Sequence, residues 1–184
     1  MEYFKKIAGK KVYLSPINIE DYERYTEWLN DLEVSINLTL ATEILTKEKE
    51  KEIIEKLSKE KYNFAIIDNA TNELIGNCGL MNIDMINRCA EMGIFIGNKG
   101  YWNKGYGTEA IKLLLDFSFN LINLNNIFLQ VKDFNKRAIK SYKKCGFKEI
   151  GHRRDANIMG NKKFDTIYMD ILAEEFTGKI PDIF

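Results

Sequence analysis

Two spaced glycines carry the most informative chemistry in this sequence. Gly105 and Gly107 lie in the segment Tyr101–Ala110, which reads YWNKGYGTEA. The apolar run Met92–Ile96 before this segment is strand-like, and the residues after it have the spacing of an amphipathic helix. Glycines let a backbone approach an anion closely, and the N–H groups and dipole of a helix N-terminus favour negative charge. This strand–loop–helix pattern predicts a site for a phosphorylated cofactor.

Two familiar phosphate-binding motifs fit this loop poorly. A P-loop counted from Gly100 places Tyr106 where lysine is required, so that interpretation fails. The dinucleotide fingerprint G-x-G-x-x-G/A is formally matched by Gly105, Gly107 and Ala110. That fingerprint belongs in the first βα turn of a parallel unit, whereas hairpin-like strands precede this loop. A dinucleotide-binding oxidoreductase therefore stays open as the less favoured alternative.

The elements that must position the loop do not follow a regular βαβ order. Helices are predicted from the cap Asn18 to about Leu29, from the cap Thr46 to about Lys59, over 108–121, and from the cap Asn135 through Lys144. Strands are predicted at 12–14, 62–67, 73–82, 90–97, 127–131, 147–151 and 164–172. Together they predict an α/β (α+β) fold with a mixed, mostly antiparallel sheet of about six to seven strands flanked by about four helices. We expect a single domain over residues 1–184.

Composition argues against several classes of protein. The 27 basic residues equal the 27 acidic ones, so no nucleic-acid partner is expected. No membrane association is expected either, because no apolar run is long enough to span a bilayer and the first residues lack a signal-peptide core. Cys78, Cys89 and Cys145 form no C-x-x-C motif and predict free thiols in the cytoplasm. His152 is the only histidine, so no metal site is expected.

A second motif occupies residues 135–147, which read NKRAIKSYKKCGF. On a helix, Asn135, Ala138 and Tyr142 stand at i, i+3 and i+7 and share a face. This segment and the glycine loop, in this order, resemble the two signatures of the GCN5-related N-acetyltransferase superfamily. The resemblance covers most of the chain and implies that superfamily's fold and an acetyl-CoA-dependent transfer to an amine.

The resemblance also points to a branch of that superfamily. Its cofactor motif is Q/R-x-x-G-x-G/A, and Trp102 stands where glutamine or arginine is usual. The variant found here is typical of a branch that resembles the ribosomal-protein N-terminal acetyltransferases. The segment 151–169 further resembles the bacterial spermidine acetyltransferases. The acceptor is thus expected to be a protein N-terminal α-amine or a polyamine, and both remain open.

The same resemblance implies where acetyl-CoA would bind. Backbone N–H groups of Ile94, Phe95 and Ile96 would bind the thioester carbonyl and the pantetheine arm. Asn135 would bind the pantetheine amides, and Ala138 shares its face. The loop residues would hold the pyrophosphate; they are Trp102, Asn103, Lys104, Gly105, Tyr106, Gly107 and Thr108.

Two residues are expected to move protons in this reaction. A free amine is mostly charged at neutral pH, and the carboxylate of Glu91 is the candidate that takes its proton, directly or through water. Tyr142 would protonate the departing thiolate, since a phenol and a thiol have similar basicity. The simpler alternatives are that Glu91 is an ordinary strand-end carboxylate and that Tyr142 is a core aromatic. A non-catalytic acyl-CoA-binding module would keep the loop and show no turnover.

The first helix and the loop after it carry the candidates for the acceptor site. Trp28 and Glu33 lie in a segment that resembles the corresponding stretch of the ribosomal-protein N-terminal acetyltransferases. The acidic residues of this region have two interpretations: an acidic lip that suits a polycationic substrate, or an ordinary solvated helix face. They are Glu20, Asp21, Glu23, Glu27, Asp31 and Glu33. A homodimer is expected only by analogy with similar proteins.

Overall fold

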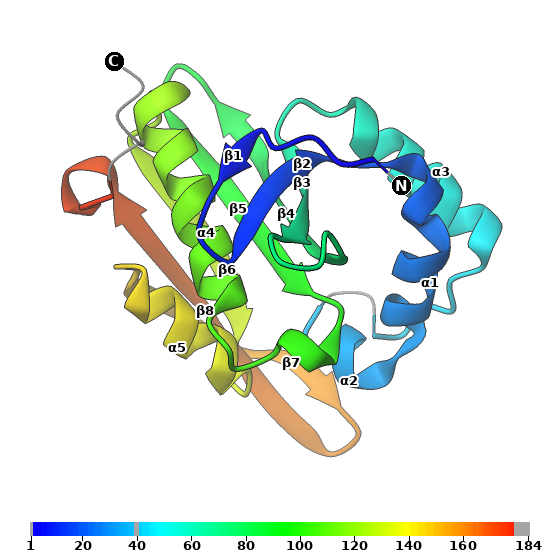
Figure 1. Cartoon of the computed structure of the whole chain (residues 1–184). Helices are drawn as coiled ribbons and strands as arrows, with labels where there is room; N and C mark the ends of the chain where they lie inside the picture. Colours follow the sequence, from blue (N-terminus) through cyan, green and yellow to red (C-terminus); the bar gives the residue numbers. More distant parts are fainter. Residues whose placement is uncertain (1, 39–40, 179–184) are drawn as a thin grey trace. The chain divides into compact units, whose positions relative to one another are not determined.

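Antiparallel pairing dominates the sheet, as the hairpin-like sequence patterns predict. The computed structural model describes residues 2–38 and 41–178, which form eight strands in the order β1-β2-β3-β4-β5-β6-β8-β7 (Figure 1). The parallel pair is β5 with β6, and its register runs from Cys89↔Asn126 to Glu91↔Phe128. The strands are β1 (Ile7–Ala8), β2 (Val12–Pro16), β3 (Asn63–Asp68), β4 (Leu74–Asp84), β5 (Cys89–Ile96), β6 (Asn126–Lys132), β7 (Lys148–Met159) and β8 (Lys162–Leu172).

The sheet has more strands than predicted because β1 is too short to produce a recognisable sequence pattern. β1 has two residues, too few for a period-2 alternation. β7 reaches Met159 and so runs beyond the predicted end at residue 151, because the turn at Gly160, with φ +58°, pairs Met159 with Lys162. The mixed, mostly antiparallel α/β fold is confirmed.

Five α-helices occur among the described residues, and their caps agree with the sequence where the signal is local. They are α1 (Tyr22–Asn30), α2 (Leu32–Ser35), α3 (Lys47–Lys59), α4 (Tyr106–Asp116) and α5 (Lys136–Lys144). Thr46 caps α3 by accepting a hydrogen bond from the Lys49 N–H, as predicted. Asn18 caps a short 3-10 turn, Ile19–Asp21, which precedes α1. The four-residue α2 was not predicted.

The central helix begins and ends differently from the prediction. α4 starts at Tyr106, two residues before Thr108, because Gly105 at φ +88° turns the chain immediately ahead of it. The α-helix ends at Asp116, and Phe117–Leu121 continue as a π-helical turn. The Ser118 hydroxyl donates to the Leu114 carbonyl at 2.6 Å inside this transition. Amphipathic spacing alone does not distinguish these two helical forms.

The chain divides into two compact units, each with its own packing. Unit 1 contains residues 1–79 and 94–110, and unit 2 contains residues 80–93 and 111–184. β4, β5 and α4 therefore each contribute residues to both units. None of the helices among the described residues is long and apolar enough to cross a membrane.

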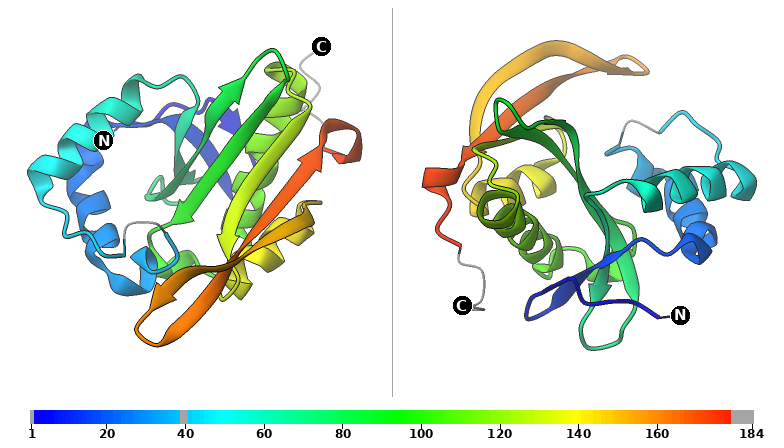
Figure 2. Two further views of the ribbon diagram at one scale, coloured as in Figure 1. Left: turned by 180° about the vertical axis from the view of Figure 1, so that it is seen from behind. Right: turned by 90° about the horizontal axis from the view of Figure 1, so that it is seen from above.

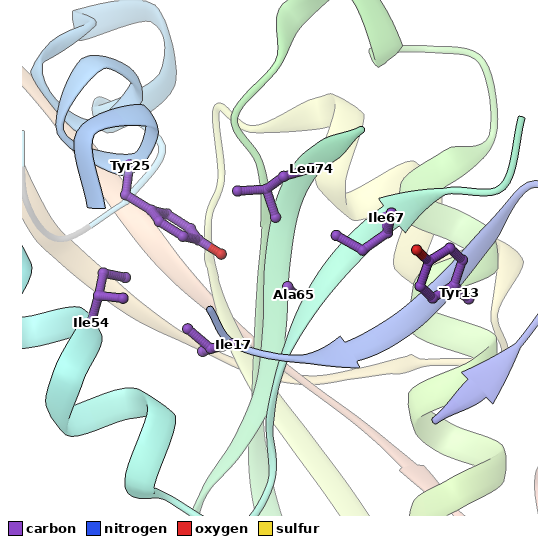
Figure 3. Packing of buried hydrophobic residues seen from close by; sticks show 7 residues of the cluster. All are labelled: Tyr13, Ile17, Tyr25, Ile54, Ala65, Ile67 and Leu74. Atoms are coloured by element: carbon purple, nitrogen blue, oxygen red, sulfur yellow. The ribbon is translucent and has the colours of Figure 1, made fainter. Parts of the chain in front are cut away.

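The core of unit 1 lies between its helices and its strands (Figure 3). Tyr25 from α1 and Ile54 from α3 are almost wholly buried, and both face the strand side of the cluster. The strand side carries Ile17, Ala65 and Leu74, and Tyr13 pairs with Ile67 across β2 and β3. α1 and α3 lie side by side in this unit (Figure 2). This packing holds α1 in place and with it the candidate acceptor residue Trp28, which borders the cluster.

Unit 2 is built on β6, β8 and β7. β6 buries Ile127, Leu129 and Val131, so every second residue contributes to the core. β7 and β8 form a long antiparallel hairpin (Figure 2). α5 buries Ile139 and Tyr142, so this face of the second sequence motif lies in the core of the unit, while Asn135 and Ala138 are half-buried.

Candidate active site

The glycine loop of unit 1 is held by side chains from the β3–β4 turn. Asn98 starts the 3-10 turn Lys99–Tyr101, where its side-chain oxygen accepts from Gly100 N–H at 2.9 Å. Its amide group donates to Glu73 at 3.1 Å. The Tyr101 hydroxyl contacts Glu73 at 3.1 Å and Asp68 at 3.2 Å. The loop therefore enters α4 from a fixed support.

The two glycines of the loop differ in whether the structure requires glycine at their positions. Gly105 has φ +88°, a conformation that side-chain-bearing residues rarely adopt. Gly107 lies inside the first turn of α4, and a Cβ added there would meet the Ile96 side chain at 3.5 Å, an ordinary contact. The sequence motif treats the two positions alike. In the structure only Gly105 needs glycine, which agrees with the glycine-or-alanine choice at the second position.

Trp102 ties the loop to the end of β5. Its indole N–H donates to the Ile96 carbonyl at 2.8 Å. The Ile96 carbonyl therefore already accepts one hydrogen bond from the loop. The residue that departs from the usual glutamine or arginine thus has a defined role in shaping the loop.

The first turn of α4 also contains a contact that the sequence did not indicate. The helical spacing by itself puts Glu109 on the polar face of the helix. Its carboxylate accepts hydrogen bonds from the backbone N–H groups of Lys10 and Lys11, the latter at 2.9 Å. These partners are about 100 positions away in the sequence, so helical periodicity carried no signal for them.

The candidate acceptor residues contact the same end of β5 and the loop. The Trp28 ring lies 6.3 Å from the Phe95 ring, edge to face, and 5.6 Å from the Tyr25 ring. It also covers Gly97, where an added Cβ would come within 2.1 Å of the indole. Glu33 is exposed and pairs with Lys99 at 2.7 Å. Unit 1 thus joins Trp28 to β5, and Glu33 to the turn that leads into the glycine loop.

The acidic lip inferred from the first helix is largely accounted for by internal partners. Asp21 is 4% exposed and accepts a hydrogen bond from the Tyr3 hydroxyl at 3.0 Å, so it belongs to the interior and its assignment to a lip is wrong. Glu23 pairs with Lys47, and Asp31 pairs with Lys99, both at 2.7 Å. Three of the six lip residues, Glu23, Asp31 and Glu33, therefore form ion pairs within the chain.

In unit 2 the second motif forms one face of α5. Asn135 caps this helix, and its side-chain oxygen accepts from the Ala138 N–H at 3.1 Å. Ala138 can therefore meet a cofactor only through its methyl group. Gly146 follows the helix at φ +101°, as expected for the residue after a helix C-terminus.

Tyr142 is buried on the same helix, with its ring 5.8 Å from that of Phe147. Burial raises the pKa of Tyr142 to about 12, because the charged phenolate is poorly solvated there. The hydroxyl has no hydrogen-bond partner among residues 2–38 and 41–178. The phenol is thus fully protonated at neutral pH and able to donate. Cys145 is buried nearby, and burial raises the pKa of its thiol to about 11, so it is a packing residue rather than a nucleophile.

Glu91 lies on β5 with partners that the sequence did not reveal. Its two carboxylate oxygens accept from the amide groups of Asn82 at 2.9 Å and Gln130 at 3.0 Å. It alternates with the buried Ala90 and Met92, so it stands on the less buried face of the strand. Glu91 is held in one orientation by these amides, and it is not joined to Tyr142.

Comparison with known proteins decides the family. The model of the acetyltransferase (GNAT) domain matches residues 11–148. The chain belongs to the GNAT acetyltransferase family. An uncharacterized N-acetyltransferase p20 from Bacillus licheniformis is 31% identical over 92% of this chain and 97% of its own length. A spermidine N(1)-acetyltransferase from Vibrio cholerae is 32% identical over 62% of this chain and 65% of its own length.

A solved structure extends this GNAT relationship to three dimensions. The spermidine N-acetyltransferase from Vibrio cholerae in complex with CoA and spermine has a TM-score of 0.80 and 26% identity. The match covers 92% of this chain and 100% of that one. The sequence-based assignment to an N-acetyltransferase is confirmed by these similarities.

The GNAT family uses acetyl-CoA, and the loop of this acetyltransferase fits such a cosubstrate. Gly105 leaves the backbone open at the start of α4, where the first N–H groups of a helix lack intrahelical acceptors. Those donors and the helix dipole suit a pyrophosphate. Among the described residues, no group of three or more His, Cys, Asp or Glu side chains could hold a metal ion.

Proposed function

We propose that the protein transfers the acetyl group of acetyl-CoA to a primary amine by direct attack of the amine on the thioester. The observation that carries this proposal is the opening of α4 at Gly105, φ +88°, in a chain of the GNAT family. The loop Trp102–Thr108 would hold the pyrophosphate through backbone N–H groups. The N–H groups of Ile94–Ile96 would align the thioester carbonyl and the pantetheine arm, and Asn135 would contact the pantetheine amides.

Tyr142 would act as the general acid. When the amine nitrogen bonds to the carbonyl carbon and the carbon–sulfur bond breaks, the thiolate takes the proton of the Tyr142 hydroxyl. The raised pKa of Tyr142, about 12, supports a group that keeps its proton until the thiolate forms. It also implies that the transfer is favourable only to a thiolate that is itself shielded from water, since burial raises the basicity of both partners.

Glu91 would act as the general base. The amine must lose a proton before or during attack, and the carboxylate can take it directly or through a water. The hydrogen bonds from Asn82 and Gln130 support this role because they orient the carboxylate and leave lone pairs on both oxygens.

We propose a polyamine as the acceptor, with a protein N-terminal α-amine as the second candidate. The polyamine is favoured by the similarity to the Vibrio cholerae enzymes over most of the chain. Glu33 would contribute to recognition, although Lys99 now pairs with it and would have to be displaced by a substrate ammonium group. Trp28 would line the acceptor side next to Phe95. The second candidate rests on the likeness of the Trp28–Val34 segment to N-terminal acetyltransferases. We also place the protein in the cytoplasm, an assignment supported by its three free cysteines.

The test is thiol release from acetyl-CoA with a panel of acceptors. The panel contains spermidine, spermine, simple monoamines and short peptides with serine or alanine N-termini. We expect release with the polyamines, and Tyr142→Phe as the matched variant should bind CoA while turning over slowly. Release only with the peptides would replace the first acceptor with the second. CoA binding without release from any member would favour a binding module and would count against catalysis.

A further inference from the structure

The turn between β1 and β2 lies against the beginning of α4, although the two are about 100 residues apart in sequence (Figure 1). Both belong to unit 1. The Glu109 carboxylate accepts from the N–H groups of Lys10 and Lys11, and this fixes the turn to the first turn of the helix. A residue of this turn is therefore a permanent neighbour of the loop to which we assign the pyrophosphate.

The turn is held rigidly from its other side. The Asn69 backbone N–H donates to the Lys11 carbonyl at 2.8 Å, and its side-chain amide donates to the Gly9 carbonyl at 2.7 Å. Gly9 N–H closes the turn on the Val12 carbonyl at 2.8 Å. The backbone of Lys11 consequently has little freedom, and its side chain projects from a fixed point.

The Lys11 ammonium lies beside the glycine that opens α4. Its Nζ is 2.8 Å from the Lys104 carbonyl oxygen and 5.2 Å from the centre of the Tyr106 ring. A Cβ placed on Gly105 would be 3.9 Å from it. No carboxylate forms an ion pair with the Lys11 ammonium within residues 2–38 and 41–178, and its two contacts are with neutral groups.

An anion would be favoured at this position. The N-terminus of a helix carries about half a positive charge, and a lysine ammonium next to it is repelled. Glu109 relieves part of this repulsion, but its carboxylate is directed at backbone N–H groups. A phosphate between the ammonium and the helix N-terminus would be attracted by both. Lysine suits that role because its ammonium is a compact charge at the end of a flexible side chain. Unlike the planar arginine guanidinium, it does not require a fixed bidentate geometry.

We propose that Lys11 binds a phosphate group of the CoA moiety, turning from the Lys104 carbonyl toward the ligand. The proposal rests on the proposed function and adds a cofactor-binding residue from outside the glycine loop. The phosphate is either in the pyrophosphate or on the ribose 3′ position, since both are anions of the same chemistry. Lys10, one residue earlier in the turn, is a matched control because it has the same charge and no ammonium contact at the loop.

The experiment measures CoA and dephospho-CoA binding by calorimetry for the wild type, Lys11→Met, Lys11→Arg and Lys10→Met. We expect Lys11→Met to weaken CoA binding about tenfold, the usual size for one charge-assisted hydrogen bond. Lys11→Arg should restore most of the affinity, and Lys10→Met should bind like the wild type. Equal losses for both ligands would place Lys11 on the pyrophosphate, and a loss confined to CoA would place it on the 3′-phosphate.

Ionic strength separates a phosphate contact from a merely structural one. Salt screens a charge–charge contact, so the wild-type affinity should fall more steeply with salt than that of Lys11→Met. Equal slopes, or equal affinities, would overturn the proposal. Thermal unfolding of the ligand-free variants checks that the turn still folds. Absence of CoA binding by the wild type would instead reject the proposed function itself.

Discussion

The beginnings of α4 and α5 are built in opposite ways. α5 is preceded by Asn135, whose side chain accepts the Ala138 N–H and so occupies one of the donors of the first turn. α4 is preceded by Gly105, which has no side chain for such a cap. Its loop is held instead by hydrogen bonds from Tyr101 to Glu73 and from Trp102 to Ile96. A helix that must hold an anion benefits from unoccupied donors. A helix that must hold one side chain, Tyr142, in place benefits from a firm cap.

In the function proposed above, the opening of α4 binds the cofactor and α5 supplies the proton. Variants that should change either cofactor binding or proton transfer, and leave the other unchanged, test this assignment. The expected effects below run from the largest to the smallest.

Tyr142→Phe should lower kcat about a hundredfold and leave CoA affinity unchanged. General acid catalysis typically contributes at least this factor, and the phenyl ring preserves the packing against Phe147. Steady-state kinetics with CoA calorimetry measures both quantities. In the wild type, kcat/KM should rise with pH as the amine loses its proton, with no loss from Tyr142 until the pH nears its pKa of about 12. An unchanged kcat would show that Tyr142 is not the general acid.

Gly105→Ala should weaken CoA binding about tenfold. A methyl group at φ +88° costs about 1–2 kcal/mol, which the loop can avoid only by changing the conformation that precedes α4. Gly107→Ala is the matched control, because its methyl group would contact Ile96 at an ordinary 3.5 Å. Calorimetry measures the CoA affinity of both variants. Similar affinities for the two would mean that the left-handed glycine is not what shapes the site.

Asn135→Ala should destabilise the protein by about 1 kcal/mol through loss of the cap. Asn135→Asp keeps a capping oxygen and should retain the stability, while it loses the amide donor proposed for pantetheine. Denaturant unfolding measures the first effect, and CoA binding by the aspartate variant measures the second. If Asn135→Ala left the stability unchanged, the Asn135 side chain would not be a stabilising cap, and the contrast between the beginnings of α4 and α5 would be wrong.

Tyr101→Phe should weaken CoA binding only about twofold to threefold. It removes one partly buried hydroxyl from Glu73 and Asp68 and leaves Asn98 and Trp102 to hold the loop. The aromatic contact with Tyr106, 4.8 Å between ring centres, is preserved. Titration of CoA into the variant provides the measurement. A loss as large as that of Gly105→Ala would show that support from the β3–β4 turn matters as much as the glycine.

Local signals were read correctly from the sequence wherever the partner lies within a few residues. Thr46 and Asn135 cap their helices as predicted. Gly146, directly after α5, has the left-handed conformation that is usual for glycine at the end of a helix. The start of α4 was predicted two residues late. The reason is that the turn into the helix is made by Gly105, whose φ the sequence does not specify.

The candidate site was predictable as a list of residues, but most of their partners were not. Trp102 was identified as a departure from the motif, and its hydrogen bond to Ile96 required the structure. Glu91 was selected for its place on a strand, while its contact with Gln130 joins residues 39 positions apart. Asp21 looked like part of a charged face and is buried against Tyr3. Helical spacing describes one element and carries no information about which other element covers it.

By itself, the sequence determined the family motifs, their order and the identity of the candidate acid and base. These depend on residue type and short-range spacing, which the printed chain contains in full. Only the tertiary structure showed that the β1–β2 turn places Lys11 beside Gly105, that Lys99 holds Asp31 and Glu33, and that burial keeps Tyr142 protonated. Such facts arise from contacts between distant segments and from desolvation. Both are properties of the folded chain, and neither leaves a periodic pattern in the sequence.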